Sequence, residues 1–127
     1  MNIGDQGKFY NALNIIYNAD YKGLSGLKGQ FGSWEDAFKN SLAPHSFDAD
    51  EAWQRLANKN IKLVLRDDSN YPQLLAEIFS PPHGLYIIGN LPETELMVAI
   101  VGTRKSTKEG DSLATSFARG FASAGVP

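Results

Sequence analysis

Six consecutive residues near one end of the chain, Leu96 to Val101, carry only apolar side chains. An unbroken apolar run of this length is typical of a strand that is covered on both faces of a sheet. Gly102 then opens a polar loop, and apolar residues recur at helical spacing from Asp111 to Ala124, before Gly125. Strand, loop and helix in this order predict the opening unit of a parallel α/β sheet.

Residues 1–58 have a different pattern, in which apolar side chains recur every three or four positions. Helices are predicted over residues 8–19, over residues 21–32, from the N-cap Ser33 to Pro44, and from Asp48 or Asp50 to Asn58. Four glycines shorten the second helix, because each interior glycine costs about 1 kcal/mol relative to alanine. The predicted inward-facing residues are Phe9, Leu13, Ile16, Tyr17, Leu24, Leu27, Phe31, Trp34, Ala37, Phe38, Trp53 and Leu56.

The pattern changes at Ile61. Strands are predicted at 61–65 and 84–88, with a short helix between them that begins at Tyr71-Pro72. We therefore expect a helical domain over residues 1–60 and an α/β domain over residues 61–127. A single βα unit is half a motif, so we expect the natural protein to continue beyond Pro127. The alternative is a complete small α+β protein with a three-stranded sheet.

Composition excludes several classes of function. The 127 residues contain no cysteine, which rules out disulfides, thiolate catalysis and zinc-thiolate sites. The net charge is −2 and the pI is about 5.6, which speaks against a strongly basic nucleic-acid module but allows a local basic pocket. The N-terminus lacks a secretory signal, and no apolar stretch approaches the roughly 20 residues of a membrane span. The sequence predicts a cytoplasmic protein without a membrane partner.

The loop after the apolar run is the best candidate site. Glycine allows a ligand close to the backbone, an arginine can hold a phosphate through two hydrogen bonds, and hydroxyls and free N–H groups add donors. The predicted phosphate-binding residues are Gly102, Thr103, Arg104, Lys105 and Ser106, with Thr107 and Lys108 beside them. The loop matches neither G-x-G-x-x-G nor G-x-x-x-x-G-K-[ST]. A polar loop whose glycine only makes the turn remains the alternative.

Other polar and aromatic residues give weaker signals. His45 and His83 each follow a proline and are interpreted as solvated loop histidines, and Asp67-Asp68 as a turn rather than a metal site. Gly23 to Gly26 faintly resembles a DNA-binding hairpin, although a plain interhelical turn is favoured. Four aromatic residues could stack on bases, but packing is favoured: Trp34, Trp53, Tyr71 and Tyr86. No catalytic residue, metal site or cofactor is predicted.

Three motifs in order carry a family resemblance. They are Tyr71-Pro72-x-Leu74-Leu75, then Pro81-Pro82-x-x-Leu85-Tyr86-x-x-Gly89-Asn90, then VAIVGTR at residues 98–104. Each motif is weak alone, but their order and spacing together resemble the DNA-processing protein A (DprA/Smf) family. The helical segment with Phe31-Gly32-Ser33 resembles the N-terminal helical domain of that family.

The resemblance implies both a fold and a function. The implied fold is α/β: a small sterile-alpha-motif-like (SAM-like) helical domain, then an extended Rossmann domain that is truncated here after its first βα unit. The implied function is binding and protection of single-stranded DNA, and its delivery to the RecA recombinase in natural transformation and DNA recombination. The implied protein is not an enzyme and is a homodimer at full length. The family's phosphate-contacting G-[ST]-R motif falls on Gly102, Thr103 and Arg104.

Two departures from the family pattern matter. Glu109 stands where many members carry an aromatic residue, and its negative charge weakens the local positive field. The family's second motif and its dimer-forming part would lie beyond Pro127.

Two other functions remain open. One is a nucleotide phosphoribohydrolase-like enzyme that holds a ribose 5′-phosphate in the same loop, although no clear catalytic acid is present. The other is a protein-interaction role for the helical domain.

Overall fold

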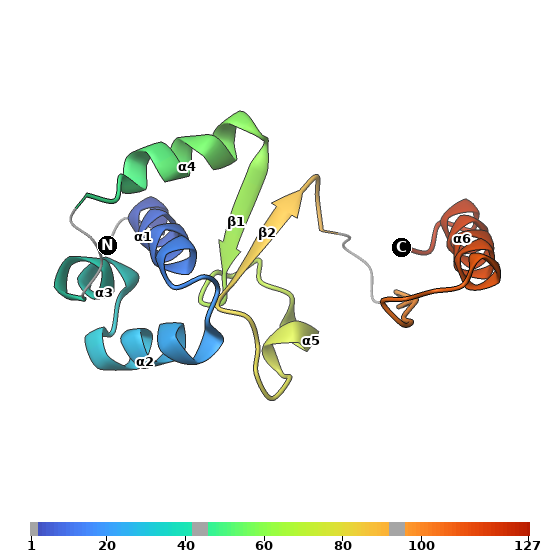
Figure 1. Cartoon of the computed structure of the whole chain (residues 1–127), viewed down its shortest axis with the longest axis horizontal. Coiled ribbons are helices and arrows are strands. Elements are labelled where there is room, and N and C mark those ends of the chain that lie inside the picture. Colours follow the sequence, from blue (N-terminus) through green and yellow to red (C-terminus); the bar gives the residue numbers. More distant parts are fainter. Residues whose placement is uncertain (1–2, 42–45, 92–95) are drawn as a thin grey trace. The chain divides into compact units, whose positions relative to one another are not determined.

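The computed structural model describes residues 3–41, 46–91 and 96–127, with side chains from Gln6 onward (Figure 1). The predicted helix end at Pro44 and the predicted solvated His45 lie outside the described residues. The chain forms two compact units, Met1–Asn90 and Leu91–Pro127. No helix in the described part of the chain is long and apolar enough to cross a membrane.

The first unit begins with four helices: α1 (Ile3–Ile16), α2 (Tyr21–Phe31), α3 (Trp34–Asn40) and α4 (Ala49–Asn58). Two predicted helix starts are confirmed, because Ser33 accepts a hydrogen bond from Asp36 N and Asp48 accepts one from Glu51 N. The expected interhelical turn at residues 23–26 is wrong. Asp20 caps α2 from upstream through the N–H groups of residues 22 and 23, so the glycines lie inside the helix.

Strands β1 (Ile61–Leu65) and β2 (Gly84–Ile88) form an antiparallel sheet, in which Leu63 lies opposite Tyr86. Both strands and the short helix α5 (Gln73–Ala76) were predicted from the sequence. The connection between the strands is held by Tyr71, whose buried hydroxyl donates a hydrogen bond of 2.8 Å to the carbonyl of Pro82. In Figure 1 the sheet lies beside α1 and α4, and both helices contact β1.

The core of the first unit is built around α1. Leu13, Trp34 and Ala37 are almost completely buried, and the other buried members of the same cluster are Tyr10, Leu24 and Leu65. The predicted inward-facing positions are therefore largely confirmed, and Tyr10 is a core residue that the helical pattern missed. Because Leu65 of β1 shares this core, the strands pack with the helices in one unit. The domain division after residue 60 stays a prediction.

The second unit contains helix α6 (Lys108–Ser123) and the segment before it. Thr107 caps the helix by accepting a hydrogen bond of 3.1 Å from Gly110 N, and Gly125 follows its end with a φ of 73°. The predicted strand at residues 96–101 is wrong. A buried strand needs a hydrogen-bonded neighbour, and no described segment pairs with these residues as a strand. The structure shows a mixed helix and sheet protein, whereas the Rossmann and SAM-like assignments stay predictions.

Candidate nucleic-acid interface

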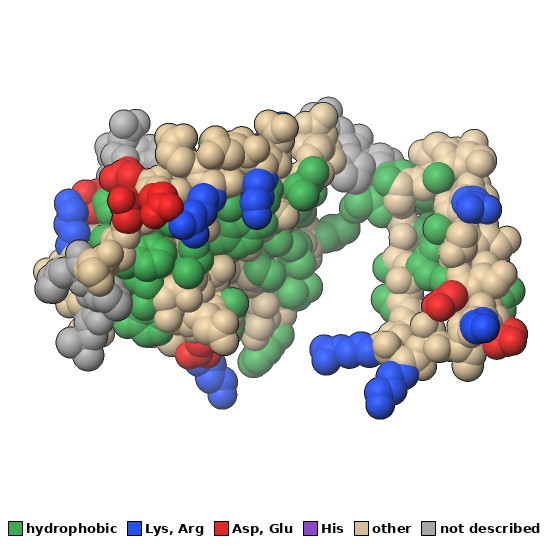
Figure 2. All heavy atoms as spheres, turned by 45° about the horizontal axis from the view of Figure 1, so that its top comes forward, with side chains coloured by type: hydrophobic (Ala, Val, Ile, Leu, Met, Phe, Trp, Pro, Cys, Tyr) green, Lys and Arg blue, Asp and Glu red, His purple; other side chains and the backbone are tan. Residues whose placement is uncertain are grey.

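The predicted phosphate loop leads directly into α6. Residues 102–107 are all exposed, and the loop is folded locally by a hydrogen bond of 3.3 Å from Lys105 N to Thr103 Oγ1. Figure 2 shows Lys and Arg side chains projecting from the surface of the second unit. The chain thus presents the predicted loop residues together on one exposed turn.

Arg104 is available to a ligand in this arrangement. No described carboxylate lies within 4.0 Å of its guanidinium. The ion pairs found among the described residues all lie in the first unit. An exposed guanidinium without an acidic partner keeps its donors for a bidentate acceptor such as a phosphate. Glu109 and Asp111 lie in the first turn of α6 and reduce the positive potential of the loop.

The backbone around the loop also favours an anion. The amides of the first two residues of α6, Lys108 and Glu109, have no acceptor within the helix, whereas Gly110 N is already capped. Gly102 has no positive φ, so the turn does not require glycine for its conformation. A Cβ at Gly102 would meet no atom within 4 Å, which leaves open space above the backbone.

The acidic pair after β1 is a turn, as interpreted from the sequence. Asp68 Oδ2 accepts a hydrogen bond of 2.7 Å from Leu65 N, and Asp67 forms an ion pair of 3.2 Å with Lys28. No cluster of three or more acidic or histidine side chains that could hold a metal occurs in the described part of the chain. Trp34 and Tyr71 are buried, which confirms the packing interpretation for both.

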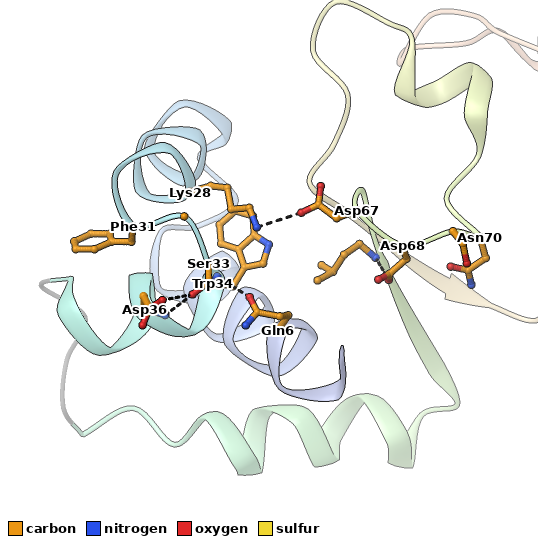
Figure 3. A pocket seen from close by; sticks show the side chains of 12 residues that line it. Gln6, Lys28, Phe31, Ser33, Trp34, Asp36, Asp67, Asp68 and Asn70 are labelled. Carbon is orange, nitrogen blue, oxygen red and sulfur yellow. Dashed lines mark hydrogen bonds and ion pairs between the residues drawn. The ribbon is translucent and has the colours of Figure 1, made fainter. Parts of the chain in front are cut away.

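A large cleft lies in the first unit, between α2, α3 and the turn after β1 (Figure 3). Its volume is about 1080 Å³, and we call it the acidic cleft because Asp36, Asp67 and Asp68 line it with one lysine, Lys28. Three carboxylates against one ammonium group disfavour a phosphate. The sequence did not reveal this cleft, because its lining residues come from three separate stretches of the chain that only the tertiary fold brings together.

The interpretation of His83 as a solvated histidine is wrong. Its imidazole is half-buried and stacks on Tyr21 with ring centroids 5.1 Å apart. It lies nearly perpendicular to the ring of Trp34, with the two ring centroids 5.2 Å apart. Ser25 Oγ lies 2.7 Å from His83 Nε2. Burial lowers the pKa of His83 from its usual 6.5, and the positive charge of Arg66 lowers it further. A histidine before a strand gives no signal of such burial until the helices that cover it are placed.

Residues 62–127 match the family model described as DNA recombination-mediator protein A. The chain belongs to this family. The match includes the predicted phosphate loop and α6, so the resemblance seen in the three motifs is confirmed. No solved structure matches the chain.

Two relatives of this chain carry the name Protein Smf. The protein from Synechocystis sp. (strain ATCC 27184 / PCC 6803 / Kazusa) is 36% identical over 104 residues, which are 78% of this chain and 23% of the relative. The protein from Borreliella burgdorferi (strain ATCC 35210 / DSM 4680 / CIP 102532 / B31) is 35% identical over 66 residues, which are 51% of this chain and 21% of the relative. The chain thus spans less than a quarter of the length of these relatives.

Proposed function

We propose that this chain supplies a phosphate-binding loop to a protein that binds and protects single-stranded DNA and delivers it to the RecA recombinase. Membership of a recombination-mediator family supports a role in DNA processing. The observation that carries the proposal is the position of Arg104, which is exposed, without a described ion-pair partner, and next to the N-terminus of α6.

In the proposed complex each part of the loop has a separate role. The guanidinium of Arg104 holds a backbone phosphate through two hydrogen bonds, and Lys105 adds a point charge. Thr103 and Ser106 donate hydroxyl hydrogen bonds, and Gly102 lets the strand approach the backbone. All these contacts are made to the sugar–phosphate backbone, so binding is independent of base sequence and weakens as salt rises.

The proposal describes a binding protein, in which the loop holds the strand and breaks no bond. It includes a homodimer of the whole protein and a role in natural transformation in the cytoplasm. Dimerisation would place two loops on one strand, and two linked sites bind more tightly than either alone.

The test is a fluorescence anisotropy titration of labelled oligo(dT) with the chain and two variants. Arg104→Ala should weaken binding clearly, because a charge-assisted bidentate contact is lost. Arg119→Ala is the matched control, since it removes the same exposed charge from the same unit, outside the loop. Equal affinity of the wild type and Arg104→Ala overturns the proposal. Release of free base from nucleoside monophosphates would instead support the phosphoribohydrolase alternative.

A further inference from the structure

A second pocket in the first unit lies between α1, α2 and the segment that leads into β2. Its volume is about 480 Å³. Tyr10, Tyr21, Tyr86 and His83 contribute their rings to the lining, and Asn14 contributes a carboxamide. We call it the tyrosine pocket. None of its lining residues is Asp, Glu, Lys or Arg, which distinguishes it from the acidic cleft.

We propose that the tyrosine pocket binds one nucleobase and so gives the protein a second contact with single-stranded DNA, in the unit that does not carry the phosphate loop. The inference rests on the proposed function and extends it to a separate unit of the chain. A nucleobase is a flat, uncharged ring with polar edges, and an uncharged pocket lined by rings and one amide is complementary to it.

Two of the rings are open to a ligand. Tyr21 is 37% exposed and Tyr86 is 40% exposed, although both line the pocket. Tyr21 already stacks on His83, with an angle of 17° between the ring planes. A base placed on Tyr21 would extend this stack, and stacking of this kind is sequence-tolerant because every base has a flat face.

The polar groups of the pocket are fixed before any ligand arrives. Tyr86 donates a hydrogen bond of 2.9 Å to Asn11 Oδ1 and accepts one of 3.1 Å from Asn14 Nδ2. These two bonds hold the tyrosine ring and orient the carboxamide of Asn14. The Asn14 oxygen has no hydrogen-bond donor among the described residues, so it can accept one from the amino group of adenine or cytosine.

The turn between α1 and α2 shapes one wall of the pocket. Asn18 and Ala19 have φ values of 50° and 57°, a left-handed conformation that costs free energy for residues other than glycine. Ala19 lines the pocket, and Tyr21 follows two residues later. Unfavourable backbone conformations of this kind are found most often at functional sites, where the surrounding structure holds the backbone in the shape that ligand binding needs.

The segment that lines the pocket is hydrogen-bonded to a residue with a positive charge, Arg66. The backbone N–H of Arg66 donates a hydrogen bond of 2.9 Å to the carbonyl of His83, and the charge of Arg66 acts on both His83 and Tyr71. The acidic cleft on α2 and α3 has the opposite character (Figure 3), since its carboxylates repel phosphates. Charge therefore assigns the nucleic-acid contact to the tyrosine pocket rather than to the larger cleft.

The test compares Tyr21→Ala with Tyr21→Phe in anisotropy titrations of labelled oligo(dA), both in the wild-type chain and in Arg104→Ala. Loss of one stacked base should weaken binding by about fivefold to a hundredfold in Tyr21→Ala, whereas Tyr21→Phe keeps its stacking face. On an abasic deoxyribose-phosphate strand, Tyr21→Ala should bind as the wild type does. An equal loss on the abasic strand would mean a structural effect and would overturn the base pocket.

The two proposals can fail separately. If Arg104→Ala weakens binding and Tyr21→Ala does not, the base pocket is wrong and the phosphate loop stands. If only Tyr21→Ala weakens binding, the loop is wrong and the pocket stands. Titration with free dAMP identifies the source of the base. If dAMP binds saturably and Tyr21→Ala abolishes this binding, the pocket accepts a free nucleotide. If oligo(dA) binds and dAMP does not, the pocket accepts a base only as part of a DNA strand.

Discussion

Gly84, the first residue of β2, lies directly against the ring of Tyr10 in α1. A Cβ at this position would come within 2.5 Å of Tyr10 Cε1 and 3.0 Å of Leu63 Cδ1. The strand therefore approaches the helix closely because residue 84 has no side chain. This approach also brings Tyr86, two residues later on the same strand, within hydrogen-bond reach of Asn11 and Asn14 on α1.

The first prediction concerns this contact. Gly84→Ala should lower the free energy of unfolding by about 1–3 kcal/mol, because the new methyl group overpacks a buried ring. Gly26→Ala is the control: residue 26 is exposed within α2, and a Cβ there meets no atom within 4 Å. It should raise the free energy of unfolding by about 0.5–1 kcal/mol through its higher helix propensity. Urea unfolding followed by circular dichroism measures both, and equal effects of the two substitutions would contradict this packing.

The second prediction concerns the hydroxyl of Tyr86. Tyr86→Phe removes the donor to Asn11 Oδ1, and Asn11 is a residue only 2% exposed whose Nδ2 already lacks a partner in the described structure. Leaving a buried polar atom without its hydrogen bond should lower the free energy of unfolding by about 1–3 kcal/mol. Tyr17→Phe, directly after the helix that carries Asn11, removes a hydroxyl with no such bond among the described residues and should cost less. Urea unfolding of the two variants tests the difference.

Local signals in the sequence were sufficient for most of the helices and for the antiparallel strands. Ser33 and Asp48 start their helices through their own side chains, and Gly125 ends α6 with a positive φ. Such features depend on a few neighbouring residues, so one sequence reveals them. The apolar run at residues 96–101 predicted a strand, but strand formation depends on a partner segment, and no described residues supply one.

The phosphate loop and the tyrosine pocket also differ in how far the sequence alone reveals them. The loop at Gly102–Ser106 is continuous in sequence, so its chemistry could be interpreted before its structure was known. The tyrosine pocket joins α1 and α2 to the start of β2, which lies more than 50 residues further along the chain. His83 was misinterpreted for the same reason, since its partners Ser25 and Tyr21 lie on a distant helix.

The third prediction follows from the lowered pKa of His83. The folded chain takes up the proton less readily than the unfolded chain, whose histidine titrates near 6.5. The free energy of unfolding should therefore fall as the pH drops from about 7.5 through the unfolded pKa towards the lower folded value, and it should be constant above that window. The groups that set this shift are Tyr21, Trp34 and Ser25 in contact, and the charges of Arg66, Asp67 and Lys28.

His83→Asn isolates the contribution of this one imidazole. Urea unfolding of both proteins at pH values between about 7.5 and 5.5 should show a weaker pH dependence in the variant, because asparagine does not titrate in this range. The two proteins share every other titratable group, so a difference between their slopes belongs to His83. Identical slopes for the two proteins across this window would contradict the burial of His83.

The fourth prediction separates the two proposed DNA contacts by their response to salt. Each phosphate that a protein neutralises on a single strand steepens the dependence of log affinity on log salt by about 0.7. Arg104→Ala should therefore weaken binding and also reduce this slope by about 0.7. Tyr21→Ala should weaken binding at every salt concentration and leave the slope unchanged, because stacking displaces no counterion. Titrations of labelled oligo(dA) between about 50 and 200 mM salt cover the range in which phosphate contacts dominate. An unchanged slope in Arg104→Ala would mean that the guanidinium of Arg104 contacts no phosphate. A reduced slope in Tyr21→Ala would mean that the substitution disturbs a cationic side chain instead of removing a stacked base.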